Sequence, residues 1–307
     1  MTWRKGNRLK QVSESQAEGD IAEIYREMRE SLGVPHVDGA YQALASYPEF
    51  LKLHWRALRP IVSTREFFEL ADRMRADCYT RMHGYFEIPD LNSRIGNMEF
   101  STGARQELME IVELHNYSSP LLLLLFAAQF QAFDSPVGQS GNSCTPAEHQ
   151  EFSGDVVLVP ETNAPAVVHR CYEDVKRTLG LPFVPNFYMS IARWPDFLQL
   201  YWDTLRPITR SPVYEGCHYG ARETAFALVR EFPAPLEFSI GQLSEAGISD
   251  DDIGSIIRIV EMFVNAFSAS VLNVATAKIA LEGGTGRPAH PQKFEASGTK
   301  TDKERAA

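Results

Sequence analysis

The sequence predicts an all-α protein built from two tandem helical repeats that form an intramolecular pseudo-dimer. The first observation is an internal repeat: residues 32–61 and 179–208 are identical at fifteen of thirty positions without a gap, at an offset of 147 residues. The second is that apolar residues recur at helical spacing through most of the chain. The third is that alternating apolar and polar stretches are nearly absent, as are Asn-Gly and Asp-Gly hairpin signals.

The repeat also predicts how the chain is divided. A period of 147 residues is too long for a solenoid array, whereas a duplicated domain can pack on itself across a former two-fold interface. We expect about five or six helices in each repeat. The predicted segments are an N-terminal tail (1–16), helical repeat 1 (17–133), a linker (134–163) with a short extended stretch at 156–159, helical repeat 2 (164–282) and a disordered tail (283–307).

Local signals place individual helices in order along the chain. An apolar stripe predicts a helix over 20–31, and Gly33 is suited to end it. Pro48 and Pro195 each precede an apolar-periodic run, which is typical of proline at the first position of a helix. Ser249 and the three aspartates after it predict the capped start of a long helix that runs through Leu281.

Composition excludes several classes of protein. The 307 residues carry 30 Lys and Arg against 40 Asp and Glu, a net charge of −10, which argues against nucleic-acid and membrane partners. The longest apolar run, 120–128, is shorter than the roughly 20 residues that span a bilayer, and no signal peptide is visible. The four cysteines form no zinc-like or CxxC spacing, so we expect reduced thiols in a cytoplasmic protein without a bound metal.

The segment 115–120 (HNYSSP) is the first candidate for chemistry. Ser118 and Ser119 before Pro120 predict a helix start, whose free backbone N–H groups could bind a carboxylate or a halide. The alternative is an ordinary cap between two core helices. The corresponding segment of repeat 2, 264–268, lacks the proline.

The loop before the second predicted helix of each repeat is the other candidate. In repeat 1 it offers His36 and Asp38, a base and a group that could orient it. The alternative is a capping aspartate beside a surface histidine. In repeat 2, Asn186 is the one polar side chain of this loop. Arg59 and Arg206, at equivalent positions near helix C-termini, are interpreted as structural.

Three segments follow one another along the chain: LGVP…ALASYPEFL…W, then HNYSSPLLLLL, then LGLPFVPNFYMSIARWPDFL…W. In these segments and in their order, the chain resembles the group I 2-haloacid dehalogenases, an all-helical family that acts on D- and L-2-haloacids. The resemblance covers residues 17–282. It implies one active site between the repeats, where an Asp activates water to displace halide from C2 of a small carboxylate. It also implies that no metal or organic cofactor takes part, and family members often form homodimers.

At the family's decisive positions this chain differs. Phe187 occupies the position of the catalytic Asp, directly after Asn186, and Ser119 occupies that of the key Asn; Asn116 and Tyr117 match the preceding Asn-Tyr. Asp38 could supply a relocated base from repeat 1. The expected catalytic positions are Asn186, Phe187, Ser119 and Asp38, and the expected substrate-binding residues are His36, Asn116, Tyr117, Ser118 and Tyr188.

Three functions are compatible with these residues. The first is a hydrolase of small 2-halocarboxylates with a substituted active site. The second is a non-catalytic protein that binds small carboxylates. The third is a different enzyme that reuses the pocket between the repeats, because a fold does not determine one function.

Overall fold

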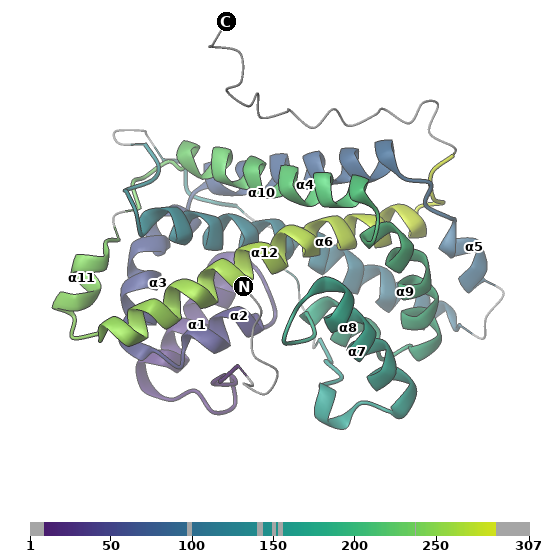
Figure 1. Cartoon of the computed structure of the whole chain (residues 1–307), viewed down its shortest axis with the longest axis horizontal. Coiled ribbons are helices and arrows are strands. Elements are labelled where there is room, and N and C mark those ends of the chain that lie inside the picture. Colours follow the sequence, from purple (N-terminus) through teal and green to yellow (C-terminus); the bar gives the residue numbers. More distant parts are fainter. Residues whose placement is uncertain are drawn as a thin grey trace, which may run out of the picture.

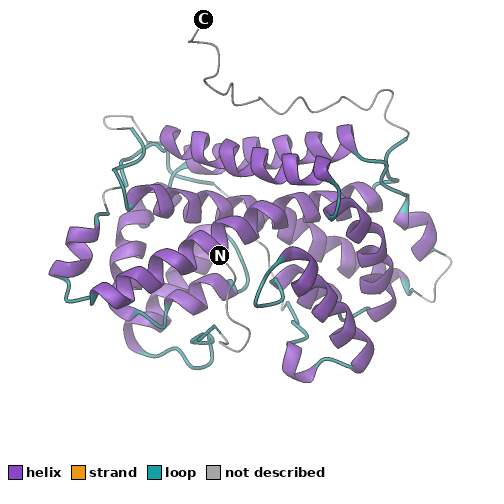
Figure 2. Cartoon of the chain, in the orientation of Figure 1, coloured by secondary structure: helices purple, strands orange, loops and turns teal. Residues whose placement is uncertain are grey.

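A computed structural model describes residues 9–96, 100–139, 144–148, 152, 156–236 and 238–286. Helices dominate these residues (Figure 2). Over the same described ranges the extended pairing consists of two isolated bridges, Thr64 with Pro146 and Val137 with Leu236. The predicted all-α class is therefore confirmed.

Twelve α-helices follow one another along the described chain. The first half contains α1 (Gly19–Leu32), α2 (Gly39–Leu44), α3 (Pro48–Val62), α4 (Arg65–Tyr85), α5 (Leu91–Ile95) and α6 (Thr102–Ala132). The second half contains α7 (Ala166–Leu179), α8 (Asn186–Ile191), α9 (Pro195–Thr209), α10 (Pro212–Leu228), α11 (Ile240–Glu245) and α12 (Asp250–Leu281). Two short 3-10 segments, η1 (Glu161–Asn163) and η2 (Val229–Glu231), connect helices.

The helices form three levels (Figure 1). The antiparallel pair α4 and α10 lies along one side, and the two longest helices, α6 and α12, cross beneath it. Two clusters, α1–α3 and α7–α9, lie side by side below the crossing. Because α6 also contacts α8 and α12 contacts α2, each long helix reaches the other half of the chain.

The predicted helix ends agree with the structure. Gly33 ends α1 in the left-handed region at φ 64°, where glycine carries no Cβ penalty. Pro48 and Pro195 are the first residues of α3 and α9, and the Ser249 hydroxyl accepts from the N–H of Asp252 at the start of α12.

Supporting contacts recur at the 147-residue offset. The indole N–H of Trp55 donates to Glu27, and that of Trp202 donates to Asp174. Arg59 and Arg206 pair with these same two carboxylates, at 3.4 and 3.2 Å. The two arginines therefore hold α3 on α1 and α9 on α7, as their structural interpretation expects. Helices α1–α3 and α7–α9 also begin and end 147 residues apart.

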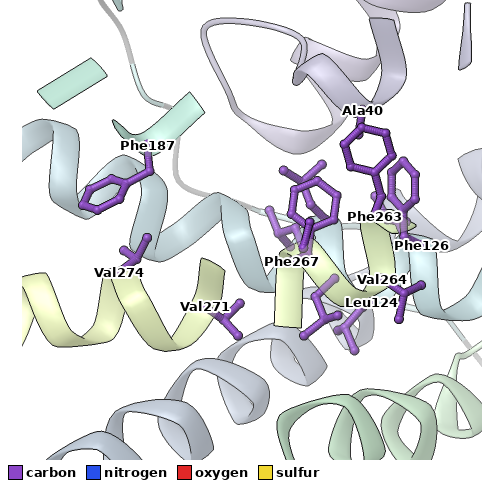
Figure 3. Close-up of a cluster of buried hydrophobic side chains, with 14 of the residues drawn as sticks. Ala40, Leu124, Phe126, Phe187, Phe263, Val264, Phe267, Val271 and Val274 are labelled. Atoms are coloured by element: carbon purple, nitrogen blue, oxygen red, sulfur yellow. The ribbon is translucent and has the colours of Figure 1, made fainter. Parts of the chain in front are cut away.

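The core is centred on α6 and α12. Figure 3 shows buried side chains of both helices, with Ala40 of α2 near one end of the cluster and Phe187 of α8 near the other. By length and composition α6 and α12 could each cross a membrane, but 89% and 61% of their most apolar windows are buried inside the protein. In α6, the helix extends on both sides of the apolar run 120–128, from Thr102 to Ala132.

One expectation about α6 is wrong. The sequence predicted a helix start at Ser118–Pro120, but α6 continues unbroken from Thr102 to Ala132 with Pro120 inside it. The backbone N–H groups around Pro120 that were expected to bind an anion therefore lie inside a helix, where N–H groups donate to carbonyls of the preceding turn. Proline has no N–H, so what it frees is the carbonyl of Asn116, four residues earlier.

The predicted linker and tails are only partly described. Residues 156–159 lie outside any strand, and the N–H of Val159 donates to Met189 O at 2.9 Å. Of the predicted disordered tail, 283–286 is ordered: Thr285 donates to Ile88 O and, through its hydroxyl, to Phe86 O. Residues 287–307 lie outside the described residues, as do 1–8 of the N-terminal tail.

Candidate active site

A small cavity lies where α1, the loop after it and α2 face the middle of α6. The cavity volume is about 30 Å³, enough for two or three waters. Its wall is mainly apolar with a few polar groups, as is typical of small-molecule sites. The lining residues are Met28, Arg29, Leu32, Val34, His36, Val37, Asp38, Tyr41, Leu114, His115, Ser118, Leu121 and Leu122.

Asp38 supplies the carboxylate of this cavity. It is the N-cap of α2, where its Oδ1 accepts the N–H of Ala40 at 2.9 Å. Burial raises the pKa of Asp38 to about 6, although the bond from Ala40 opposes this shift. A carboxylate with this pKa is largely ionised at neutral pH and is a stronger base than an ordinary aspartate.

Two histidines line the same cavity, and both stay neutral. Their ring centroids lie 6.4 Å apart. Burial lowers the pKa of His36, and burial with the nearby His36 lowers the pKa of His115 to about 3. The Ser190 hydroxyl, 2.8 Å from His115 Nε2, already donates to a carbonyl of α8, so His115 Nε2 is the donor of that pair.

A second-half residue also reaches the cavity wall. Asn186 Nδ2, at the first residue of α8, lies 3.5 Å from His36 Nε2. An amide NH₂ can only donate, so this contact favours the His36 tautomer with its proton on Nδ1. In the structure, His36 Nδ1 and the Tyr41 hydroxyl are buried and have no hydrogen-bond partner.

Of the predicted site residues, the structure brings three to the cavity: His36, Asp38 and Ser118. Asn186 reaches it through His36. Asn116 lies on α6 outside the cavity lining, and its Nδ2 is 3.5 Å from Glu113. The Tyr117 hydroxyl donates to Leu32 O at 3.0 Å, so its polar atom is used to hold α6 against α1.

The other three predicted residues lie away from the cavity lining. The Ser119 hydroxyl is 3.5 Å from that of Ser270 on α12. Phe187 is buried, with its ring 5.3 Å from that of His115. The Tyr188 hydroxyl accepts from Asn273 at 3.1 Å in a separate buried network.

The predicted site residues did not include Tyr41 or His115, although His115 is the first residue of the candidate segment 115–120. Tyr41 is three residues after Asp38, and His115 three before Ser118. Residues at this spacing share one face of a helix, so helical periodicity was the signal that could have found both. Across the described residues, no group of three His, Cys, Asp or Glu side chains is placed to hold a metal ion.

Four polar side chains of the cavity have apolar counterparts in the second half. At the repeat offset of 147 residues, Phe183 and Pro185 stand opposite His36 and Asp38. At the offset of 148 that applies to the long helices, Phe263 and Ala266 stand opposite His115 and Ser118. Since the second half folds with apolar residues at these places, the fold does not require the polar ones.

Comparisons with known proteins give one consistent result. The family model "Halocarboxylic acid dehydrogenase DehI" matches residues 35–181. An (R)-2-haloacid dehalogenase of Pseudomonas putida is 26% identical over 276 residues, covering 88% of this chain and 92% of the relative. A configuration-inverting 2-haloacid dehalogenase of Alcaligenes xylosoxydans xylosoxydans is 23% identical and covers 91% and 96%.

Solved structures agree with the sequence relatives. A D-2-haloacid dehalogenase mutant superposes with a TM-score of 0.87 at 26% identity, covering 92% of this chain and 98% of that one. A complex of such a mutant with D-2-CPA superposes at 0.86, covering 90% and 97%. In sequence and in fold, this chain is therefore similar over about nine-tenths of its length to the 2-haloacid dehalogenases.

Proposed function

We propose that this protein is a hydrolase that releases halide from small 2-halocarboxylates, with a substituted active site in the first half of the chain. The observation that carries the proposal is the cavity in which Asp38, His36, His115 and Ser118 meet. Their counterparts in the second half are apolar, which is expected of residues kept for chemistry rather than for folding. The relatives, named 2-haloacid dehalogenases, supply the reaction class.

Asp38 is the general base of the proposed reaction. Its carboxylate takes a proton from a water molecule while the water oxygen forms a bond to C2 of the substrate. The carbon–halogen bond breaks in the same displacement and its electron pair leaves with the halide. The products are a 2-hydroxycarboxylate and halide, and Asp38 returns its proton to solvent. No covalent ester, metal or organic cofactor takes part, as the family resemblance implies.

The proposal extends to the architecture. We propose that two helical repeats, 17–133 and 164–282, pack as a pseudo-dimer with one working site. The equal spacing of α1–α3 and α7–α9 supports it, as do the contacts of α6 with α8 and of α12 with α2. We further propose that the chain is cytoplasmic and that two chains can form a homodimer.

The remaining predicted residues take supporting roles in this proposal. Ser118 faces the substrate, and Asn186 orients His36. Phe187 closes the wall behind His115, where the family carries its catalytic Asp. Asn116, Tyr117, Ser119 and Tyr188 hold α6 and α8 in place through the contacts described above.

The test is halide release from D- and L-2-chloropropionate by the wild type, Asp38→Asn and Asp90→Asn. Asparagine caps a helix about as well as aspartate, so Asp38→Asn removes the base and keeps the cap. Asp90 caps α5 in the same way but lies outside the cavity, which makes it the matched control. We expect wild-type turnover, at least a 100-fold loss in Asp38→Asn and no loss in Asp90→Asn. Full activity of Asp38→Asn would refute the assignment of the base.

A non-catalytic carboxylate-binding protein is the second candidate. What favours it is Phe187, because the family resemblance implies a catalytic Asp at this position and a phenyl ring accepts no proton. This candidate predicts that 2-chloropropionate raises the melting temperature of the wild type while no halide appears. Halide release that depends on Asp38 would exclude it.

A further inference from the structure

Two unpartnered polar atoms in the cavity wall point to the part of the substrate that binds there. In the part of the chain that the structure describes, six buried side-chain atoms have no hydrogen-bond partner, and two of them, His36 Nδ1 and the Tyr41 hydroxyl, belong to residues that line the cavity. A buried polar group without a partner costs about 1–3 kcal/mol of stability. A group of this kind beside a cavity is accounted for when a bound ligand supplies the missing partner.

Both atoms act as hydrogen-bond donors. Tyr41 keeps its proton, because burial and the charge of Asp38 raise the pKa of its hydroxyl. His36 carries its proton on Nδ1 in the tautomer that Asn186 favours. The cavity therefore offers two neutral donors, and a ligand that satisfies both needs two acceptor atoms.

The second half supports a role in binding rather than in folding. Tyr188, the counterpart of Tyr41 at the 147-residue offset, has its hydroxyl bonded to Asn273 at 3.1 Å. Phe183, the counterpart of His36, has no polar atom in its side chain. At these two positions, the second half therefore has no unpaired hydrogen-bond donor. In the first half, the equivalent positions carry two unpaired donors on residues that line the cavity.

We propose that His36 Nδ1–H and the Tyr41 hydroxyl form the subsite that takes the carboxylate of the substrate, and that Asn186 is a positioning residue that sets the His36 tautomer. A carboxylate has two acceptor oxygens, one for each donor. The arginine in the lining, Arg29, is already paired with Glu14 at 3.0 Å. Lys176 and Glu161 repeat that pair in the second half at 2.5 Å, which marks it as structural.

This inference rests on the proposed function, so its test separates binding from turnover. Propionate carries the carboxylate but no leaving group, and propionamide is its neutral analogue. Isothermal titration measures the affinity of the full-length wild type for each, and then that of Tyr41→Phe and Asn186→Leu for propionate. Tyr214→Phe is the matched control, because its hydroxyl is equally buried but donates to Asn273 at 2.6 Å.

We expect the wild type to bind propionate and not propionamide. Tyr41→Phe loses a hydrogen bond to a charged group and should bind propionate about 10- to 100-fold more weakly without a fall in melting temperature, because the hydroxyl it removes had no partner. Asn186→Leu should weaken binding less, about 3- to 10-fold. Tyr214→Phe should bind normally but melt at a lower temperature, since it removes the donor to the buried Oδ1 of Asn273.

Three results would overturn the subsite. These are Tyr41→Phe binding propionate within twofold of the wild type, propionamide binding as tightly as propionate, and Tyr214→Phe weakening binding as much as Tyr41→Phe. A wild type that binds propionate through Tyr41 but releases no halide from 2-chloropropionate would refute the proposed hydrolysis and leave the subsite standing. If the wild type releases halide and Tyr41→Phe does so with an unchanged kcat/KM, the subsite is refuted and the proposed hydrolysis stands.

Discussion

Replacing Asp38 with asparagine should make the protein more stable while it removes the proposed base. The folded pKa of Asp38, about 6, lies above its ordinary value of 3.8, so its ionisation opposes folding. The penalty is absent below pH about 4, grows as the pH rises toward 6 and is complete above that. Asparagine is neutral at every pH and keeps the cap on α2, so it escapes the penalty.

The magnitude follows from the size of this pKa difference. A difference of one in pKa corresponds to about 1.4 kcal/mol, so a rise from 3.8 to about 6 gives an upper value of about 3 kcal/mol at neutral pH. The Asp38 side chain keeps some contact with solvent, so we expect about 1–3 kcal/mol. For a chain of 307 residues this is a rise in melting temperature of about 2–5 °C.

Urea unfolding and thermal melts of wild type and Asp38→Asn at pH 4, 6 and 8 measure this effect. The advantage of the variant should be largest at pH 8 and vanish at pH 4. Asp90→Asn is again the control: hydrogen bonds from Ser93 hold the pKa of Asp90 below its ordinary value, so this substitution should not stabilise. If Asp38→Asn is no more stable than the wild type at pH 8, burial of the ionised Asp38 carboxylate does not lower the stability of the folded protein.

Three further predictions concern the site and its supports. Halide release, followed as kcat/KM between pH 4.5 and 8, should fall on the acid side with a midpoint near pH 6, because Asp38 must be ionised; a profile that is flat to pH 4.5 contradicts this. Asp174→Asn should lower stability by about 1–2 kcal/mol at pH 7, because the pKa of Asp174 is held at about 2, chiefly by hydrogen bonds from Trp202 and neighbouring arginines; this loss should shrink as the pH falls from 4 to 2, and urea unfolding at each pH checks it. Ser118→Ala, which copies Ala266 of the second half, should raise KM for 2-chloropropionate without changing the melting temperature; an unchanged KM removes Ser118 from the substrate site.

Much of the backbone could be predicted from the sequence. The ends of helices depend on local chemistry, so Gly33, Pro48 and Ser249 identified them from short segments alone. The interpretation of Ser118–Pro120 as a helix start failed for a reason that local chemistry does not contain. α6 packs against α12, α10, α4 and α8, and this packing stabilises a continuous helix across Pro120.

The site was harder to predict than the backbone. Asp38 and His36, which line the cavity, were predicted as site residues because their residue types suit acid–base chemistry. The role of the Tyr41 hydroxyl depends instead on the absence of a partner in the folded protein, which no sequence pattern reports. The contact of Asn186 with His36 joins positions 150 residues apart, and the family resemblance implied only that one active site lies between the two repeats.

The unequal halves have a consequence for how such a site can change over time. In an assembly of two identical subunits, every substitution appears twice, so a buried charge introduced on one side is introduced on the other as well. Here positions 38 and 185 are encoded separately, and one carries Asp while the other carries Pro. The chain therefore bears this buried carboxylate once, and the equivalent position of the second half keeps a residue that carries no charge.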